Sequence, residues 1–471
     1  MPATPEPLSG EDLAFWYSDQ PRQRTTMALL LLLDRRPHSK QLRAAAWRAI
    51  RAVPRLRQRV VDAPFDLARP TWQDDPTFDL DFHIRRYALS HEDGATEHAT
   101  LDDLFHTIGP IYERPFDRTR PLWELIELDG PGPGSAVFFR LHHAVADGVG
   151  GNAILAALTD DSAESGADGV DVEPSPGSWP DEDLATRLRA ALGQRLDEAR
   201  AQQRAVWDAA WTALREPASL ARAARIAGAV LEDARDTTAS PLTGFGRARH
   251  LSGIEVPFQA LREARDALGG KMIDVLLTAV TGAVGEWHAV HGYGDVAEVR
   301  TQVPINLRAR ADQGLAAGTG NRATGVSVKL PIAEPDPAAR FAEIHRRMEE
   351  RKVHPAVDFM PKLSEMLAVL PRPVYRALTF AGSQSVNLIV TNVPGIMQPR
   401  YLAGARITAG YPFAPTAPQC PVSVALYGYD GRLYVGVDAD GSVVSDLDEF
   451  CGYLDRSFDR VIAAAARRRS A

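Results

Sequence analysis

The residues best suited to chemistry lie in one short segment, residues 141–151, which contains His142, His143 and Asp147. Adjacent histidines on an extended segment point to opposite faces, so only one of them can face a given cleft, and this disfavours a metal site that uses both. The glycines that follow Asp147 let the backbone turn tightly. A histidine at a strand end, beside an acid and a glycine-rich turn, suits a general base that takes a proton from a hydroxyl. The alternative, that both histidines are hydrogen-bonded core residues, fits the bare pattern equally well.

Two strands and a helix must hold this segment in place. The apolar residues 136–141 predict a buried strand that leads into it, and residues 122–128 predict the strand before. Residues 129–134 join the two as a hairpin turn, and the prolines in this turn remove backbone donors that a phosphate-binding loop requires. Residues 152–155, after the glycines, are helix-like.

Strand and helix patterns occur in both halves of the chain, which predicts an α/β fold with two domains of mixed sheets and flanking helices. In the first half, residues 25–33 predict a buried strand, residues 40–53 a helix, and the alternating residues 79–84 a half-buried strand. In the second half, residues 273–287 predict a helix. Strand-like runs follow in the second half at 299–305, 323–330, 386–391, 422–427 and 433–437.

The two domains are expected at residues 1–158 and 244–471, joined by residues 159–243. The connection opens as a polar linker rich in Asp, Gly, Ser and Pro. Residues 181–215 then predict an amphipathic helix that packs its apolar stripe on the body of the protein, and its arginines leave a membrane-surface helix as the alternative. A second helical segment is expected at residues 219–235. The stripe contains Leu184, Leu188, Leu192, Leu196, Trp207, Trp211 and Leu214.

Length and charge restrict the class of protein. A chain of 471 residues is long enough for two or three domains or one duplicated architecture. Lys and Arg number 53 against 61 Asp and Glu, and the net charge of −8 argues against a nucleic-acid partner. The only cysteines, Cys420 and Cys451, cannot form a disulfide framework or a four-thiolate zinc site, which favours a reducing compartment. Without a secretory signal or a run of about 20 apolar residues, we expect a cytoplasmic protein.

The string HHAVADG at residues 142–148 resembles the HHxxxDG motif of CoA-dependent acyltransferases. This superfamily includes chloramphenicol acetyltransferase-like enzymes, the condensation domains of peptide synthetases and the bacterial wax ester synthase/diacylglycerol acyltransferases. Further stretches resemble the last group in the same order along nearly the whole chain. They are LSGED at 8–12, FDLDFH at 78–83, PFDRTRPLWE at 115–124, NLIVTNVPG at 387–395, YDGRL at 429–433, and Asp440.

The resemblance implies two chloramphenicol acetyltransferase-like domains with a tunnel at their interface. His143 would be the base, and it would deprotonate an alcohol that attacks the thioester carbonyl of acyl-CoA, with His142 in a supporting role. Asp147, followed by Gly148, would shape the loop and pair with Arg57. Because the alcohol attacks the thioester directly, such a reaction needs no covalent intermediate. It implies no metal and no cofactor, and acyl-CoA counts as a substrate.

The resemblance also implies residues that contact substrate. These are Pro121, Leu122, Trp123, Asp274 and Asn392. The family commonly has an asparagine where this chain has Ile273, and this departure leaves the acyl acceptor open. For Pro121, Leu122 and Trp123, packing near the tunnel is the simpler role.

The expected function is therefore transfer of a long acyl chain from CoA to diacylglycerol, a fatty alcohol or both, giving triacylglycerol or wax ester. One alternative is a condensation-like acyltransferase that acts on another alcohol or a specialised metabolite. The other is a catalytically silent lipid-binding protein. Lipid substrates imply peripheral attachment to the inner membrane or to lipid droplets, and the pattern leaves the oligomeric state open.

Overall fold

The computed structural model has a mixed α/β fold, which confirms the predicted class. The described part of the chain contains two six-stranded sheets and one three-stranded sheet. The structure describes residues 5–470, except 89–98, 165–182, most of 216–236, 307–322, 353–362 and the single positions 22, 132, 245, 247, 369, 371, 384, 385 and 418. The expected polar linker and the helix expected at 219–235 therefore lie largely outside the described residues.

The N-terminal sheet has the strand order β12–β13–β2–β7–β6–β5. Its strands are β2 (Thr26–Leu33), β5 (Ile84–Tyr87), β6 (Trp123–Asp129), β7 (Ser135–His142), β12 (Tyr401–Leu402) and β13 (Ala405–Phe413). The buried strands predicted near β2, β6 and β7 are confirmed. Strands β12 and β13 come from late in the chain, and β13 pairs antiparallel with β2. The C-terminal part of the chain thus completes the N-terminal sheet, which a division by sequence position does not describe.

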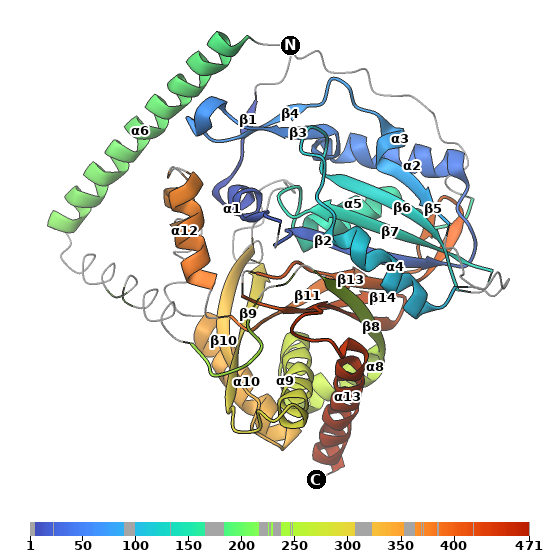
Figure 1. Ribbon diagram of the computed structural model, residues 1–471. Coiled ribbons are helices and arrows are strands. Elements are labelled where there is room, and N and C mark those ends of the chain that lie inside the picture. Colours follow the sequence, from blue (N-terminus) through green and yellow to red (C-terminus); the bar gives the residue numbers. More distant parts are fainter. Residues whose placement is uncertain are drawn as a thin grey trace.

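The C-terminal sheet has the order β10–β9–β11–β14–β15–β8, and β11 runs parallel to both of its neighbours. Its strands are β8 (Arg249–Pro257), β9 (Glu298–Asn306), β10 (Ala323–Pro331), β11 (Leu388–Ile396), β14 (Val422–Tyr429) and β15 (Arg432–Asp440). Four helices pack on this sheet and on each other in the lower part of Figure 1. They are α8 (Phe258–Leu268), α9 (Met272–Val290), α10 (Pro337–Lys352) and α13 (Leu447–Ser470).

The remaining helices belong to the N-terminal part or stand outside both sheets. They are α1 (Gly10–Ser18), α2 (Ser39–Ala52), α4 (Leu101–Glu113), α5 (Gly148–Leu158), α6 (Leu184–Arg215) and α12 (Arg372–Ser383). The helices predicted at the positions of α2, α6 and α9 are confirmed. The small sheet joins β1 (Glu6–Pro7), β4 (Thr71–Asp74) and β3 (Gln58–Val61), and a short 3₁₀ turn, η1 (Pro54–Arg57), precedes β3.

The strand expected at residues 79–84 is wrong. The short helix α3 (Leu80–His83) occupies most of this stretch, and β5 begins only at Ile84. The Asp79 carboxylate accepts a hydrogen bond from the backbone N–H of Asp81 at 2.9 Å. This local bond gives the backbone an alternative to a sheet ladder, so that it turns where the apolar alternation predicts extension.

Two apolar cores lie on the two sides of the molecule. The second is built from the C-terminal sheet, its helices and the adjoining loops. The first centres on the N-terminal sheet but also takes in Tyr411, Phe413, Tyr427 and Tyr434 from late strands. The two sheets are therefore joined through a common layer of aromatic side chains, and this layer adjoins the site described below.

Helix α6 departs from the sequence-based expectation. It lies at the upper left of Figure 1, and its second half projects from the rest of the described chain. Leu184, Leu192, Leu196, Trp207 and Trp211 are exposed and Leu188 is half-buried, so the prediction that the whole stripe packs on the body is wrong.

Within the described residues, no single helix has both the length and the hydropathy to cross a bilayer. Helices α8 and α9 reach that threshold only when they are taken together across a bend of 99°. Most of α9 is buried in the second core.

Candidate active site

The alternation of side chains along β7 builds one wall of a cavity. Phe139 and Leu141 both line this cavity, and so does Leu29, the cross-strand partner of Phe139 on β2. Every second side chain of a strand points to the same face, and the same phase reaches His143, the first residue after β7. His142 consequently points away, and only His143 of the two lines the cavity.

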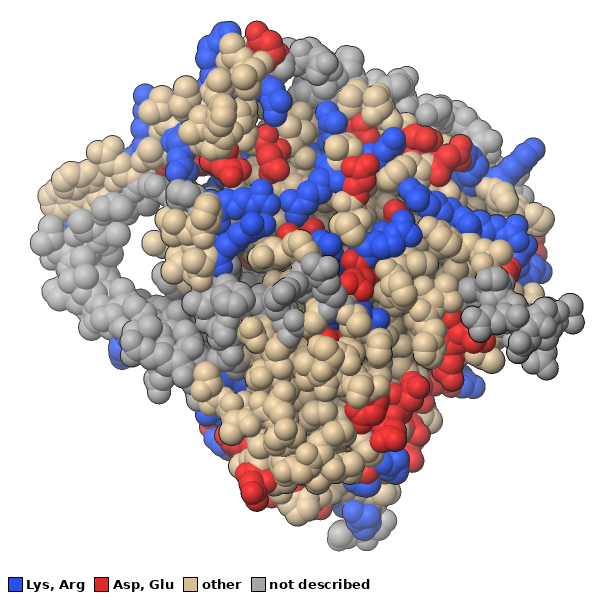
Figure 2. Space-filling view, in the orientation of Figure 1, with Lys and Arg blue, Asp and Glu red and all other residues tan. Residues whose placement is uncertain are grey.

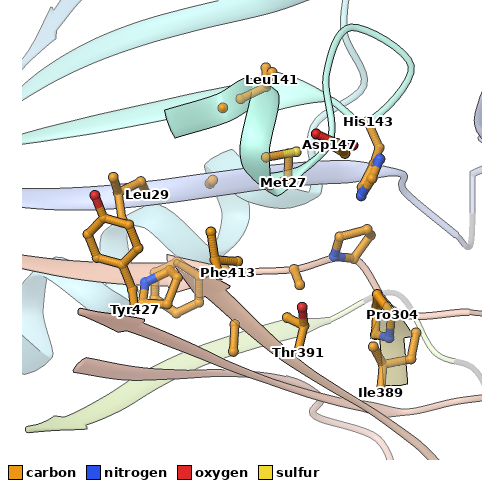
Figure 3. A pocket seen from close by; sticks show the side chains of 18 of the residues that line it. Met27, Leu29, Leu141, His143, Asp147, Pro304, Ile389, Thr391, Phe413 and Tyr427 are labelled. Carbon is orange, nitrogen blue, oxygen red and sulfur yellow. The ribbon is translucent and has the colours of Figure 1, made fainter. Parts of the chain in front are cut away.

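The cavity has a volume of about 280 Å³ and lies between the two six-stranded sheets. Strands β2, β7 and β13 form one wall, and β9, β10, β11 and β14 form the other. Figure 3 shows His143 reaching into the space between the strand that carries Met27 and the strand that carries Thr391. Most of the lining is apolar, which suits a hydrocarbon chain. The polar side chains that line it are His143, Asp147, Asn152, Gln302, Thr391 and Tyr427.

Two contacts fix the position of His143. Its backbone N–H donates to the carbonyl oxygen of Thr25 at 2.7 Å, which ties the end of β7 to the chain before β2. Its imidazole ring stacks on Phe15 of α1, with ring centroids 3.9 Å apart and an interplanar angle of 17°. The ring is therefore held flat against an aromatic surface while it lines the cavity, an arrangement that fixes its orientation toward a substrate.

His142 is a structural residue. Its Nε2 lies 2.8 Å from the hydroxyl oxygen of Thr25, and its Nδ1 accepts the backbone N–H of Ala144 at 3.1 Å. Because Nδ1 accepts, the proton of the neutral ring is assigned to Nε2, which donates to Thr25. Burial lowers the pKa of His142 to about 4, so the ring is neutral at physiological pH. Its supporting role consists in holding the strand end from which His143 projects.

Asp147 caps the helix that follows the motif. Its carboxylate Oδ1 accepts the backbone N–H of Gly150 at 2.8 Å, so that it serves as the N-cap of α5. No ion pair between Asp147 and Arg57 is found in the described part of the chain, and the predicted pair is not observed. The Arg57 backbone carbonyl accepts the N–H of Asp75 at 3.0 Å.

Gly148 lies where helix α5 approaches strand β11. A Cβ atom at this position would lie 3.2 Å from Cγ2 of Val393 on β11. Asn152 of the same helix donates a hydrogen bond to the carbonyl oxygen of Pro394. Helix α5 and strand β11 therefore meet at the edge of the cavity, and a larger side chain at position 148 would crowd Val393.

Pro121, Leu122 and Trp123 are buried, but they do not line the cavity. The carbonyl oxygen of Leu122 accepts the backbone N–H of His142 at 2.9 Å. The Trp123 indole N–H donates to the carbonyl oxygen of Leu56 at 2.7 Å. Leu122 thus contacts the strand end that carries the histidines, and contact of the three residues with substrate stays a prediction.

Asp274 and Ile273 lie at the start of α9, and neither lines the cavity. Asp274 is fully buried, and its Oδ2 accepts the backbone N–H of Lys271 at 2.8 Å and lies 2.8 Å from Nδ1 of His345. Ile273 packs against the second core. The exchange of a family asparagine for Ile273 therefore alters the packing of a helix start.

Asn392 is one position out of phase with the site. Ile389, Thr391 and Val393 of β11 line the cavity, whereas Asn392 between them is exposed. Strand β11 continues past Asn392 to Ile396. Extending the strand alternation from the predicted run at 386–391 would have selected Thr391. Phe15, Gln302 and Phe413 had no local signal, because the fold brings them to the cavity from distant positions.

Comparison with known proteins shows which family the chain resembles. The family model of the wax ester synthase/diacylglycerol acyltransferase catalytic domain matches residues 8–276, and the model of the C-terminal domain of the same family matches residues 319–461. A Mycobacterium tuberculosis H37Rv protein with the name of a diacylglycerol O-acyltransferase is 33% identical over 459 residues, which cover 94% of this chain and 89% of the relative. A second protein of that name and strain is 28% identical over 450 residues, which cover 94% and 92%.

Solved structures show the same fold. The wax ester synthase/diacylglycerol acyltransferase from Marinobacter aquaeolei VT8 superposes with a TM-score of 0.61 at 17% identity, over 98% of this chain and all of that chain. The first condensation domain of the calcium-dependent antibiotic synthetase superposes with a TM-score of 0.62 at 16% identity, over 99% and 97%. The two-domain architecture with a chloramphenicol acetyltransferase-like fold is thereby confirmed.

The catalytic-domain model spans more than half of the chain, and it contains the motif that presents His143 to the cavity. The relatives align over nearly the full length. The chain therefore belongs to the wax ester synthase/diacylglycerol acyltransferase family, and it is an acyltransferase.

Proposed function

We propose that the protein transfers a long acyl chain from acyl-CoA to a lipid alcohol, with His143 as the general base. The observation that carries the proposal is the position of His143 in a cavity whose lining is otherwise mostly apolar. An acyl chain can lie along the apolar walls while its thioester carbonyl remains beside the imidazole. Holding the two reactants in line supplies a large part of the rate enhancement of such a reaction.

The proposed proton path uses the His143 imidazole twice. The ring accepts the hydroxyl proton of the alcohol as the alcohol oxygen bonds to the thioester carbon. The tetrahedral adduct then expels the CoA thiolate by breaking the carbon–sulfur bond, and the imidazolium returns the proton to the sulfur. Thr391 and Gln302 line the opposite wall and can donate hydrogen bonds to the oxyanion of the adduct.

The proposed acceptors are diacylglycerol and fatty alcohols, which give triacylglycerol and wax ester. Support comes from the family model and from the names of the relatives. A condensation-like reaction with an acyl group on a carrier protein is the second candidate, because condensation domains share the fold.

A donor and acceptor panel tests the proposal. Release of CoA thiol is measured from acyl-CoA esters of increasing chain length, with diacylglycerol, a fatty alcohol or no alcohol, and the ester product is identified by mass spectrometry. We expect thiol release that depends on both a long acyl chain and an alcohol. Turnover with an acyl-carrier-protein donor and none with acyl-CoA would favour the condensation-like reaction instead. Bound lipid without turnover on any pair would contradict the proposed substrates.

A further inference from the structure

The outer face of α6 exposes large apolar side chains along the whole helix. A helix at the surface of a protein ordinarily turns such an apolar stripe toward the core. An apolar patch that stays exposed marks a site of contact with another molecule or with a membrane. The exposed fractions are 56% for Leu184, 50% for Leu192, 57% for Leu196, 60% for Trp207 and 57% for Trp211.

The polar contacts that the described residues of α6 make with the rest of the protein lie in its first half. Arg187 donates to the carbonyl oxygen of Asp62 at 3.3 Å, and Glu198 pairs with Arg69 at 3.3 Å. Beyond Glu198, no hydrogen bond or ion pair joins α6 to the body in the described part of the chain. The two tryptophans therefore lie on the part of the helix that projects farthest from the anchored end (Figure 1).

The charge of α6 is opposite in sign to that of the chain. The helix carries six arginines against three acidic residues, whereas the whole chain has a net charge of −8. The guanidinium of Arg215 lies 5.8 Å from the ring centroid of Trp211, so that a cation and an indole form one unit at the end of the helix. In Figure 2, basic side chains lie along the edges of α6, and a larger group of basic side chains, with acidic ones among them, crosses the face beside it.

We propose that α6 docks the protein on the surface of a bilayer that contains anionic lipid. The leucines and tryptophans would enter the boundary between headgroups and acyl chains, while the arginines reach the lipid phosphates. A second copy of this chain is a poorer occupant, because two copies of a positively charged helix repel each other. The inference goes beyond the reaction and does not depend on the acyl acceptor, because it rests on exposure and charge alone.

The experiment uses the full chain and vesicles of phosphatidylcholine with or without phosphatidylglycerol. Binding is measured by co-sedimentation for the unchanged protein, for Trp207→Gln/Trp211→Gln, and for Tyr293→Gln. Tyr293 is 45% exposed and lies beyond the end of α9, which makes it a matched control. We expect binding only to vesicles with phosphatidylglycerol and a loss of about tenfold in the double tryptophan variant. Tyr293→Gln should bind as the unchanged protein does.

A charge variant and a self-association measurement complete the test. Arg200→Gln/Arg204→Gln should weaken binding by about fivefold for each charge, and high salt should do the same. Equal binding by the unchanged protein and the double tryptophan variant would overturn the proposal. So would a dimer in solution that the tryptophan variant abolishes, together with no vesicle binding. Thiol release with detergent-dispersed substrates should stay within about twofold in all these variants, so a failure of the proposed reaction is seen separately.

Discussion

The cavity between the sheets and the outer face of α6 are both rich in apolar side chains, yet they differ in enclosure. Leu29 and Phe413 in the cavity face other protein atoms across a gap of limited volume. Leu192 and Trp207 on α6 face solvent. An enclosed apolar surface selects one molecule by its shape, whereas an open one selects an environment by its polarity. Local sequence shows that both regions are apolar, but only the fold decides which role each can play.

The body of the protein beside the cavity and helix α6 also differ in their response to acid, although the two histidines concerned do not line the cavity. His83 and His142 are buried, and burial lowers the pKa of each to about 4, whereas α6 contains no histidine. The unfolded chain binds these protons near pH 6.5 and the folded chain only near pH 4, so each histidine costs stability as the pH falls through that window. Each contributes a loss of about 3 kcal/mol between pH 7 and pH 4. Asp438 acts in the opposite direction, because burial raises its pKa to about 6.

The variant His83→Phe isolates one of these contributions. Phenylalanine can replace the imidazole in its stack on Trp123, where the ring centroids lie 4.6 Å apart. Urea unfolding at pH 7 and pH 4 should show that the variant loses about 3 kcal/mol less than the unchanged chain over this range. Equal losses in the two chains would show that His83 is not held neutral by burial.

A matched pair of substitutions tests the enclosed surface against the open one. Leu29→Gln places an amide in the wall of the cavity, where an unpaired polar group costs about 2 kcal/mol, so turnover of a long-chain donor should fall by about 30-fold. Leu192→Gln makes the same change on α6, where the amide is solvated. With detergent-dispersed substrates its turnover should stay within about twofold of the unchanged enzyme. Equal effects of Leu29→Gln and Leu192→Gln on thiol release would contradict the separate roles of the cavity wall and the face of α6.

The side of the cavity away from His143 should limit the length of the acyl chain. Phe413 and Tyr427 lie on that side in Figure 3. Phe413→Leu enlarges the space there and should shift the ratio of kcat/KM toward longer donors by about fivefold. Phe105 serves as the control, because its ring lies 6.0 Å from that of Phe413 but does not line the cavity. An identical shift in Phe105→Leu would show that general loosening, and not cavity length, governs the preference.

The smallest effect concerns the loop between the motif and α5. Asp147→Ala removes the N-cap acceptor and should lower the free energy of unfolding by about 1 kcal/mol, whereas Asp147→Asn keeps an acceptor and should lower it by less than about 0.5 kcal/mol. The free energy of unfolding of both variants is measured by denaturant titration. If Asp147 acted through an ion pair, both variants would lose the same stability, because both remove its charge. The difference in free energy of unfolding between Asp147→Ala and Asp147→Asn should stay the same when Arg57→Gln is added to both.

The sequence pattern was sufficient to predict those elements that depend on residues close together in the chain. The apolar runs predicted β2 and β7, and the alternation along β7 separates the phase of His143 from that of His142. The same rule fails at residues 79–84, where the Asp79 carboxylate turns the backbone into α3.

The rest of the site depends on contacts between distant parts of the chain. Strand β13 pairs with β2 across more than 370 positions, as Phe413 with Ala28 shows. No local pattern indicates that pairing, and the same holds for the stacking of Phe15 on His143. The exposure of α6 could not be predicted either, because an amphipathic stripe has the same sequence whether or not a protein surface covers it.

The central claim is that His143 accepts the proton of the attacking alcohol, and one measurement tests it most directly. Thiol release from a long-chain acyl-CoA with an alcohol present is compared for the unchanged enzyme, His143→Ala and His106→Ala, with folding checked by circular dichroism. His106 is an exposed histidine of α4 and serves as the control. We expect a loss of about a thousandfold in folded His143→Ala and no loss in His106→Ala. Full activity in folded His143→Ala would contradict the account.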